Sequence, residues 1–105
     1  MDVPQGTLDL LILTILRRES LHGYGLVQRL KGLTAGAFQL NPGSLFPALY
    51  ALERDGKLRS ERRPSENNRH ARYYTLTALG RKQLEHEERR WARAVVAISS
   101  VLEGA

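Results

Sequence analysis

A change of pattern at Gly56 constrains the fold of this chain more than any other feature of its sequence. After this residue, helical spacing gives way to two strand-length segments, 58–63 and 71–76, the second rich in tyrosine and threonine. Between them lies a run of turn-forming residues, 64–68 (PSENN). Two extended segments around such a run predict a β-hairpin with a long tip.

Three helical segments precede this hairpin. Apolar residues at three- and four-residue spacing predict a helix from Thr7, a good N-cap, to about Arg18. A second helix is expected to begin within residues 21–24 and to end near Gly32. A third helix is expected to begin within residues 41–44.

Two starts of the third helix agree with its prolines. Either Asn41 is the N-cap and Pro42 the first helical residue, or Ser44 is the N-cap and Pro47 lies in the first turn. Both are compatible with a helix because its first N–H groups have no partner within it. Gly56 can adopt the left-handed conformation and is expected to end this helix.

Thr77 is expected to cap a long last helix that carries an apolar seam. The seam has heptad spacing with Glu88 as its one polar member, and its apolar members are Leu84, Trp91, Val95, Ile98 and Leu102. A monomer of 105 residues cannot bury this seam completely. We therefore expect a two-fold homodimer with these residues at the interface, the N-terminal half of the helix packing on its own domain and the C-terminal half on the partner. The alternative is packing of the seam on the first helix of the same subunit.

The net charge of +5 is concentrated in one short segment. Residues 57–72 contain six basic and two acidic side chains, which gives this segment a charge of +4, whereas residues 1–56 are neutral. A basic hairpin either binds a polyanion such as nucleic acid or is simply a solvated surface. The charge alone does not distinguish the two.

The sequence lacks the residues that most enzyme active sites and metal sites require. The chain has no cysteine, which excludes disulfides and thiolate sites and favours a cytoplasmic protein. Residues 86–90 (HEERR) begin like a zinc-protease helix but end in arginine where the second histidine is required. We therefore expect no enzyme activity, no metal and no cofactor. The longest apolar stretch, 8–16, is too short for a membrane span, and the N-terminus lacks the basic region of a signal peptide.

Three short helices, a basic hairpin and a long closing helix describe a mainly α-helical fold, the winged helix-turn-helix followed by a dimerisation helix. We assign residues 1–76 to the winged helix-turn-helix and residues 77–105 to the C-terminal helix, within one compact unit.

Four segments resemble, in order and spacing, those of the PadR family of bacterial transcriptional regulators: 6–13 (GTLDLLIL), 21–26 (LHGYGL), 41–49 (NPGSLFPAL) and 72–77 (RYYTLT). The length is similar to that of the family's short branch, whose C-terminal addition is a single dimerising helix. Two residues depart from the family pattern. Phe46 stands where tyrosine is usual, and Asn68 stands where glycine is common at the tip of the hairpin.

The resemblance implies a DNA-binding regulator, a repressor that responds to a small molecule or another signal. In a helix-turn-helix the N-terminal end of the second helix of the motif enters the major groove, which here is the segment 41–50, and hairpin cations reach phosphates or the minor groove. Tyr24 resembles the family tyrosine whose hydroxyl reaches the DNA backbone, although a core aromatic is the alternative. The expected DNA-binding residues are Tyr24, Asn41, Gly43, Ser44, Phe46, Ala48, Arg62, Arg63, Asn68, Arg69, His70 and Arg72. A winged-helix adaptor that binds protein or RNA through the same surfaces is the alternative function.

Trp91, the one tryptophan, occupies a seam position where two-fold symmetry places it near its symmetry mate. A planar aromatic compound would stack between the two indoles, with Glu88 one turn earlier favouring a cation. This arrangement resembles the way some short PadR-type regulators recognise flat drug-like molecules, so Glu88 and Trp91 are the expected ligand residues. The alternative is that Trp91 only anchors the interface.

Overall fold

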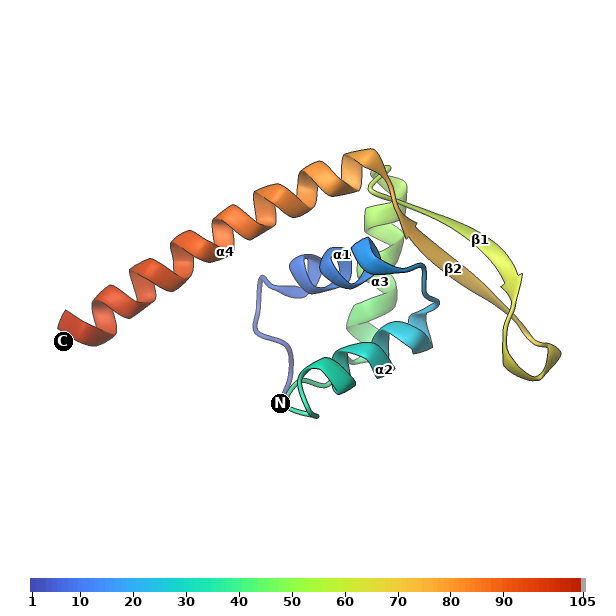
Figure 1. Cartoon of the computed structure of the whole chain (residues 1–105), viewed down its shortest axis with the longest axis horizontal. Coiled ribbons are helices and arrows are strands. Elements are labelled where there is room, and N and C mark those ends of the chain that lie inside the picture. Colours follow the sequence, from blue (N-terminus) through green and yellow to red (C-terminus); the bar gives the residue numbers. More distant parts are fainter. Residues whose placement is uncertain (105) are drawn as a thin grey trace.

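The computed structural model describes residues 1–104, and its elements follow the order that the sequence predicts (Figure 1). The helices are α1 (Leu8–Arg18), α2 (Gly23–Leu33), α3 (Pro42–Arg54) and α4 (Ala78–Gly104), and the hairpin consists of β1 (Leu58–Pro64), the 3-10 turn η1 (Glu66–Asn68) and β2 (His70–Leu76). Figure 1 shows the hairpin and α4 extending in opposite directions from a body formed by α1, α2 and α3. The predicted fold class, a winged helix-turn-helix with a long C-terminal helix, is confirmed. We call the hairpin (β1, η1 and β2) the wing.

Leucine and isoleucine side chains from both strands and all four helices meet in one core. The largest fully buried side chains are Ile12, Leu13, Leu26, Leu45, Leu49, Leu58 and Leu84. The helix α1 contacts α2, α3, β2 and α4 and is therefore the central element. Because burial of one such side chain stabilises a fold by about 1.5–3 kcal/mol, this cluster holds α3 and the wing in a fixed relation.

Local capping determines where α3 begins and ends. Asn41 is the N-cap, its Oδ1 accepting a hydrogen bond from the Gly43 amide at 2.8 Å, and Pro42 is the first helical residue. The first of the two predicted starts is therefore correct, and Pro47 lies inside the helix. Gly56 follows the C-cap with a φ of 76°, the left-handed conformation predicted for it.

Threonines precede both α1 and α4, as predicted. Thr77 caps α4, since its hydroxyl accepts a hydrogen bond from the Gly80 amide at 3.0 Å. Thr7 is the N-cap residue of α1, but its hydroxyl donates to the carbonyl oxygen of Pro4 at 2.6 Å and makes no cap bond to the helix. Thr7 therefore connects α1 to the N-terminal segment.

The wing is a regular antiparallel pair with a left-handed tip. Its register pairs Leu58 with Leu76 and continues to Pro64 opposite His70, so each strand is one residue longer than predicted. At the tip Asn67 and Asn68 have φ values of 62° and 60°. Asparagine tolerates this conformation better than most residues, which agrees with the predicted turn.

The helix α4 has two halves with different surroundings. Its N-terminal half packs on α1, where Leu84 is only 2% exposed and belongs to the core of its own chain. The prediction of Leu84 as a dimer-interface residue is therefore wrong, because a side chain this deeply buried has almost no surface left for a partner. Beyond Trp91 the seam residues Val95, Ile98 and Leu102 are exposed. No helix within residues 1–104 is long and apolar enough to cross a lipid bilayer.

Changing Gly80 to alanine is expected to lower the free energy of unfolding by about 1–3 kcal/mol, the usual cost of overpacking a core. A Cβ at this position would lie 2.1 Å from the carbonyl oxygen of Lys57 and 2.5 Å from a methyl carbon of Leu76. Urea denaturation measures the change. Gly32→Ala is the matched control, since a Cβ there meets nothing within 4 Å, and it is expected to leave stability unchanged or raise it. Equal stability of the two variants would contradict this packing.

Candidate nucleic-acid interface

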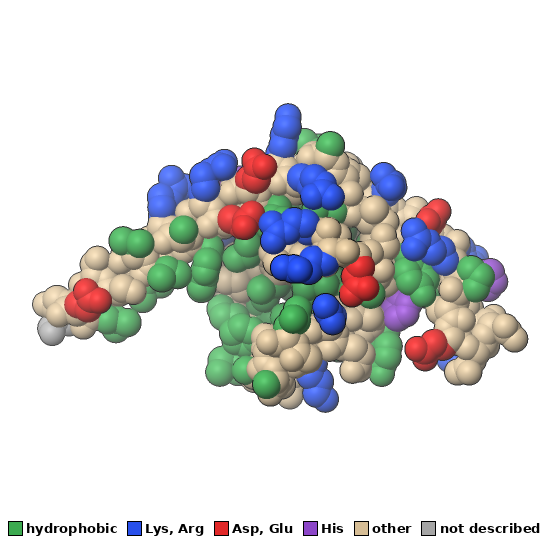
Figure 2. Space-filling view, viewed as in Figure 1, with side chains coloured by type: hydrophobic (Ala, Val, Ile, Leu, Met, Phe, Trp, Pro, Cys, Tyr) green, Lys and Arg blue, Asp and Glu red, His purple; other side chains and the backbone are tan. Residues whose placement is uncertain are grey.

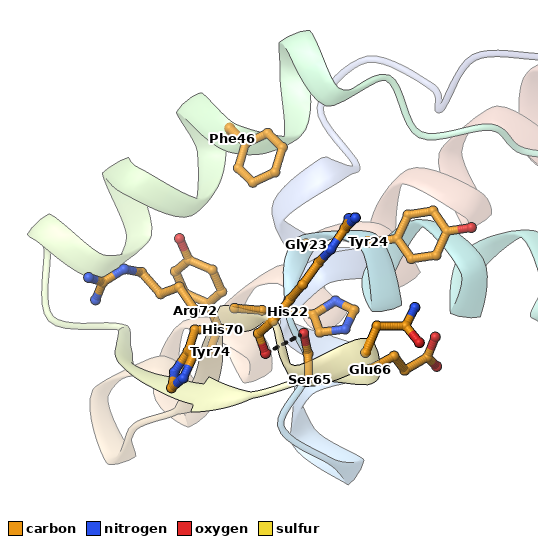
Figure 3. Close-up of a pocket in the computed structure, with 12 residues that line it drawn as sticks. His22, Gly23, Tyr24, Phe46, Ser65, Glu66, His70, Arg72 and Tyr74 are labelled. Atoms are coloured by element: carbon orange, nitrogen blue, oxygen red, sulfur yellow. Dashed lines mark hydrogen bonds between the residues drawn. The ribbon is translucent and has the colours of Figure 1, made fainter.

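A groove of about 440 Å³ lies between α2, α3 and the wing (Figure 3). It is lined by His22 and Tyr24 at the start of α2, by Phe46 of α3, and by wing residues that include Arg69 and Arg72. Segments distant in the sequence thus border one concave surface. Its lining combines aromatic rings with cations, the combination that nucleic-acid interfaces use.

A glycine allows the start of α2 to approach α3 at this groove. A Cβ on Gly23 would lie 2.8 Å from two ring carbons of Phe46, so the phenylalanine ring rests directly on the α2 backbone. Phe46 is nevertheless 41% exposed and presents its outer face to the groove. It has no hydroxyl, so it contributes an apolar surface and no hydrogen-bond donor.

The residues of α3 that are expected to bind DNA differ in their exposure. Asn41, Gly43 and Ser44 are exposed at the N-terminal end of the helix, as expected for residues that meet DNA. Ala48 is instead half-buried and packs against the core, so less of its surface is free to meet DNA. One half-turn on, Tyr50 is 63% exposed, and sequence reasoning missed it. Its spacing of four residues from Phe46 places both aromatics on one helix face.

Tyr24 is 69% exposed at the start of α2, which excludes the alternative that it is a core aromatic. Its ring stacks loosely on that of His22, with 6.4 Å between ring centroids. Tyr24 therefore lines the groove with an exposed aromatic ring.

The wing register separates its cations into two faces. Arg62, Arg72 and His70 lie on the same face of the hairpin as the buried Leu58 and Tyr74, because side chains alternate along each strand. His70 and Arg72 line the groove, and Arg69 joins them from the tip.

Arg63 lies on the opposite face of the wing from this set and is occupied within its own chain. It pairs with Glu61 at 2.5 Å, and its guanidinium lies 5.1 Å from the centre of the Tyr73 ring. Arg63 therefore interacts with other residues of the wing. Among the cations expected to bind DNA, it is the least free to bind a phosphate.

A hydrogen-bond chain connects Arg72 to α3, which is the second helix, or recognition helix, of the helix-turn-helix. The Arg72 guanidinium donates to the Ser60 hydroxyl at 2.9 Å, and Ser60 donates to the carboxylate of Glu53 on α3. Burial, with a further contribution from Glu53, raises the pKa of the neighbouring Tyr74 hydroxyl. Arg72 is oriented by this chain, whereas Arg62 and Arg69 are exposed and form no ion pair within residues 1–104.

The sequence model of the transcriptional regulator PadR-like family matches residues 12–86, which is most of the chain and covers α1 from residue 12, α2, α3, the wing and the start of α4. This chain belongs to the PadR-like family.

Known proteins support the same assignment. The PadR-like protein is 38% identical over 68 residues to the transcriptional regulator Rv3488 of Mycobacterium tuberculosis, a match that spans 65% of this chain and 60% of that protein. A PadR-like transcriptional regulator of Bacillus cereus has a similar structure, with a TM-score of 0.79, 25% identity and 96% coverage of both chains. A transcriptional regulator of Clostridium thermocellum matches the fold with a TM-score of 0.84, 23% identity, and coverage of 91% of this chain and 93% of that one.

The C-terminal seam of this PadR-like protein is exposed where dimerisation was predicted. Figure 2 shows hydrophobic side chains spread over the C-terminal part of α4, whereas Lys and Arg side chains lie along the outer edge of the middle of the helix, which has no basic residue after Arg93. Trp91 is 47% exposed and lies beside an apolar pocket of about 210 Å³ that Leu10, Leu11 and Phe38 help to line. The indole therefore contacts its own subunit as well as presenting a free face. Glu88, the other predicted ligand residue, is paired with Arg17 at 3.7 Å.

Proposed function

We propose that this PadR-like protein is a sequence-specific repressor that binds double-stranded DNA as a homodimer. The observation that carries the proposal is that Arg69 and Arg72 of the wing line the same groove as Phe46 of the recognition helix. In a winged helix-turn-helix this arrangement lets α3 enter the major groove while the wing contacts the flanking phosphates. The basic charge of residues 57–72 supports it.

A mobility-shift assay with duplex DNA from upstream of its own gene, at two salt concentrations, tests this proposal directly. We expect binding that weakens steeply with salt and that exceeds binding to random duplex of the same length, because phosphate contacts supply affinity and base contacts supply specificity. Single-stranded RNA of equal length is the comparison for the adaptor alternative. Tighter binding to RNA than to either duplex would favour the adaptor.

Changing Ser44 to leucine or Tyr50 to alanine is expected to weaken specific binding by about 10-fold, a typical loss when one base contact is disturbed. Both residues are exposed on α3, so the melting temperature should stay within a few degrees of the parent. Anisotropy titration with the upstream duplex and with a random duplex measures the effect. An equal loss on both duplexes would assign these residues to the phosphate backbone. Ala48 is unsuitable for this test because it packs against the core.

We also propose that a planar aromatic compound is the signal, bound at Trp91. The half-exposed indole beside the apolar pocket lined by Leu10, Leu11 and Phe38 supports this, since such a surface favours stacking. Titration of the dimer with planar cationic dyes is expected to quench tryptophan fluorescence saturably and to weaken DNA binding in parallel. Trp91→Ala should abolish the coupling between dye and DNA. An absence of quenching across the panel would make Trp91 an interface anchor only.

A further inference from the structure

His22 is held at the edge of the groove in a defined orientation. Only one of its two ring nitrogens takes part in capping α2. Nδ1 accepts a hydrogen bond from the Gly25 amide at 2.9 Å, which caps the helix. The ring is also fixed by an edge-on contact with Tyr73, at 5.1 Å between ring centroids, and by the loose stacking of Tyr24. Figure 3 places His22 at the groove together with Tyr24 and the wing residue Ser65.

The cap bond determines the tautomer of His22. A nitrogen that accepts a hydrogen bond carries no proton, so in the neutral imidazole the proton is on Nε2. Within residues 1–104, Nε2 has no hydrogen-bond partner. Every buried side-chain nitrogen or oxygen of those residues has a partner, so an atom without one is not buried. Nε2 is therefore open to solvent. The structure presents a neutral N–H donor, on a rigidly held ring, at the groove.

The position of α2 indicates what this donor meets. The first helix of a helix-turn-helix crosses the DNA backbone, and the N-terminal end of a helix favours anions. His22 stands at that end of α2 and lines the same groove as Arg69 and Arg72. An acceptor that bears negative charge and suits both this donor and these cations is a backbone phosphate.

We propose that His22 is a DNA-contacting residue whose Nε2–H donates a hydrogen bond to a backbone phosphate in this groove, with the Gly25 amide selecting the tautomer that makes the donation possible. The inference rests on the proposed DNA-binding function and adds a contact that carries no charge. Because a neutral donor releases no counterion, its loss lowers affinity without changing the salt dependence of binding. Loss of a wing cation lowers both.

His22→Asn separates capping from DNA contact. Asparagine is a strong N-cap residue and accepts the same helical amide, but its short side chain does not extend to the position of Nε2. The expected result is a melting temperature near that of the parent and about 10-fold weaker binding to random duplex DNA at low salt, the loss typical of a hydrogen bond to a charged group. The slope of log affinity against log salt should not change. His22→Ala removes both functions and should lower the melting temperature as well.

Nitrogen-15 NMR of the histidine rings in the unaltered protein provides a readout that does not depend on a variant. We expect His22 to show an unprotonated Nδ1 and a protonated Nε2, with the Nε2 signal shifting on addition of duplex DNA. Parental DNA affinity in His22→Asn, or a proton on Nδ1, would overturn the inference and leave the repressor proposal intact. Failure of the unaltered protein to bind duplex DNA at low salt would overturn both.

Discussion

Changing Arg62 and Arg69 together to glutamate is expected to weaken binding to every DNA sequence by at least about 100-fold at low salt, because each lost phosphate contact removes nearly one released counterion and each glutamate adds repulsion. Both side chains are exposed on the wing and form no ion pair within residues 1–104, so the fold should be unaffected. Arg72 is a poorer target, since a glutamate there would face the chain of hydrogen bonds from Ser60 to Glu53.

Anisotropy titrations at several salt concentrations measure this effect. The slope of log affinity against log salt is expected to fall by about 2 per subunit in the double variant. The matched control is Lys82→Glu with Arg89→Glu, which makes the same change in net charge on exposed residues of α4. Equal losses in the two double variants would show that total charge, and not the wing, determines affinity.

Changing Val95 and Ile98 together to glutamate is expected to convert the proposed dimer into a monomer, raising the dimer dissociation constant by at least about 100-fold. Each glutamate would place a carboxylate in an apolar interface, and burial of an unpaired charge costs several kcal/mol. Both residues are exposed on the C-terminal half of α4, so the core of the subunit is not touched. Tight operator binding should be lost with the dimer, because two half-sites can no longer be bound together.

Sedimentation of the full chain measures this change, with Val96→Glu and Ser100→Glu as the control pair on a different face of the same helix. Dimerisation of the control but not of the seam variant identifies the interface. A truncation test should end the chain at Arg90 and not at Gln83, since the shorter chain would lose the core residue Leu84. A monomeric unaltered protein would contradict the dimer proposal.

The recognition helix illustrates the limit of periodicity. Leu45, Leu49 and Leu52 recur at the three- and four-residue spacing of one helix face, and all three are in the core. Ser44 and Ala48 are both expected to bind DNA, but α3 contacts the body through α1 and α2 and also contacts the wing through β1. Ala48 lies on the covered side and Tyr50 on the open one. The spacing of apolar residues predicts one buried face of a helix. How much of the remaining helix surface is exposed depends on how many other elements pack against it.

The caps of α3 and the cations of the wing show the same difference between what the sequence predicts and what the tertiary structure decides. Asn41-Pro42 and Asp55-Gly56 contain the chemistry that begins and ends α3, so the sequence limited its start to two choices, and side-chain geometry selected Asn41. The positive charge of residues 57–72 is visible in the sequence. Which of its cations are free is not, because the pairing of Arg63 with Glu61 and the bonding of Arg72 to Ser60 depend on strand register.

What the sequence by itself determined is therefore local: the four helices, the hairpin, their caps and turns, and the family motifs that occur in order along the chain. Those features depend on contacts between residues a few positions apart, and such contacts can be inferred from the spacing of residue types along the sequence. Tertiary structure alone decided that α1 buries Leu84, that α3 exposes Tyr50, and that His22 and Arg69 line one groove. These three features depend on which surfaces of distant segments pack together. Packing between distant segments leaves no periodic pattern in a single sequence.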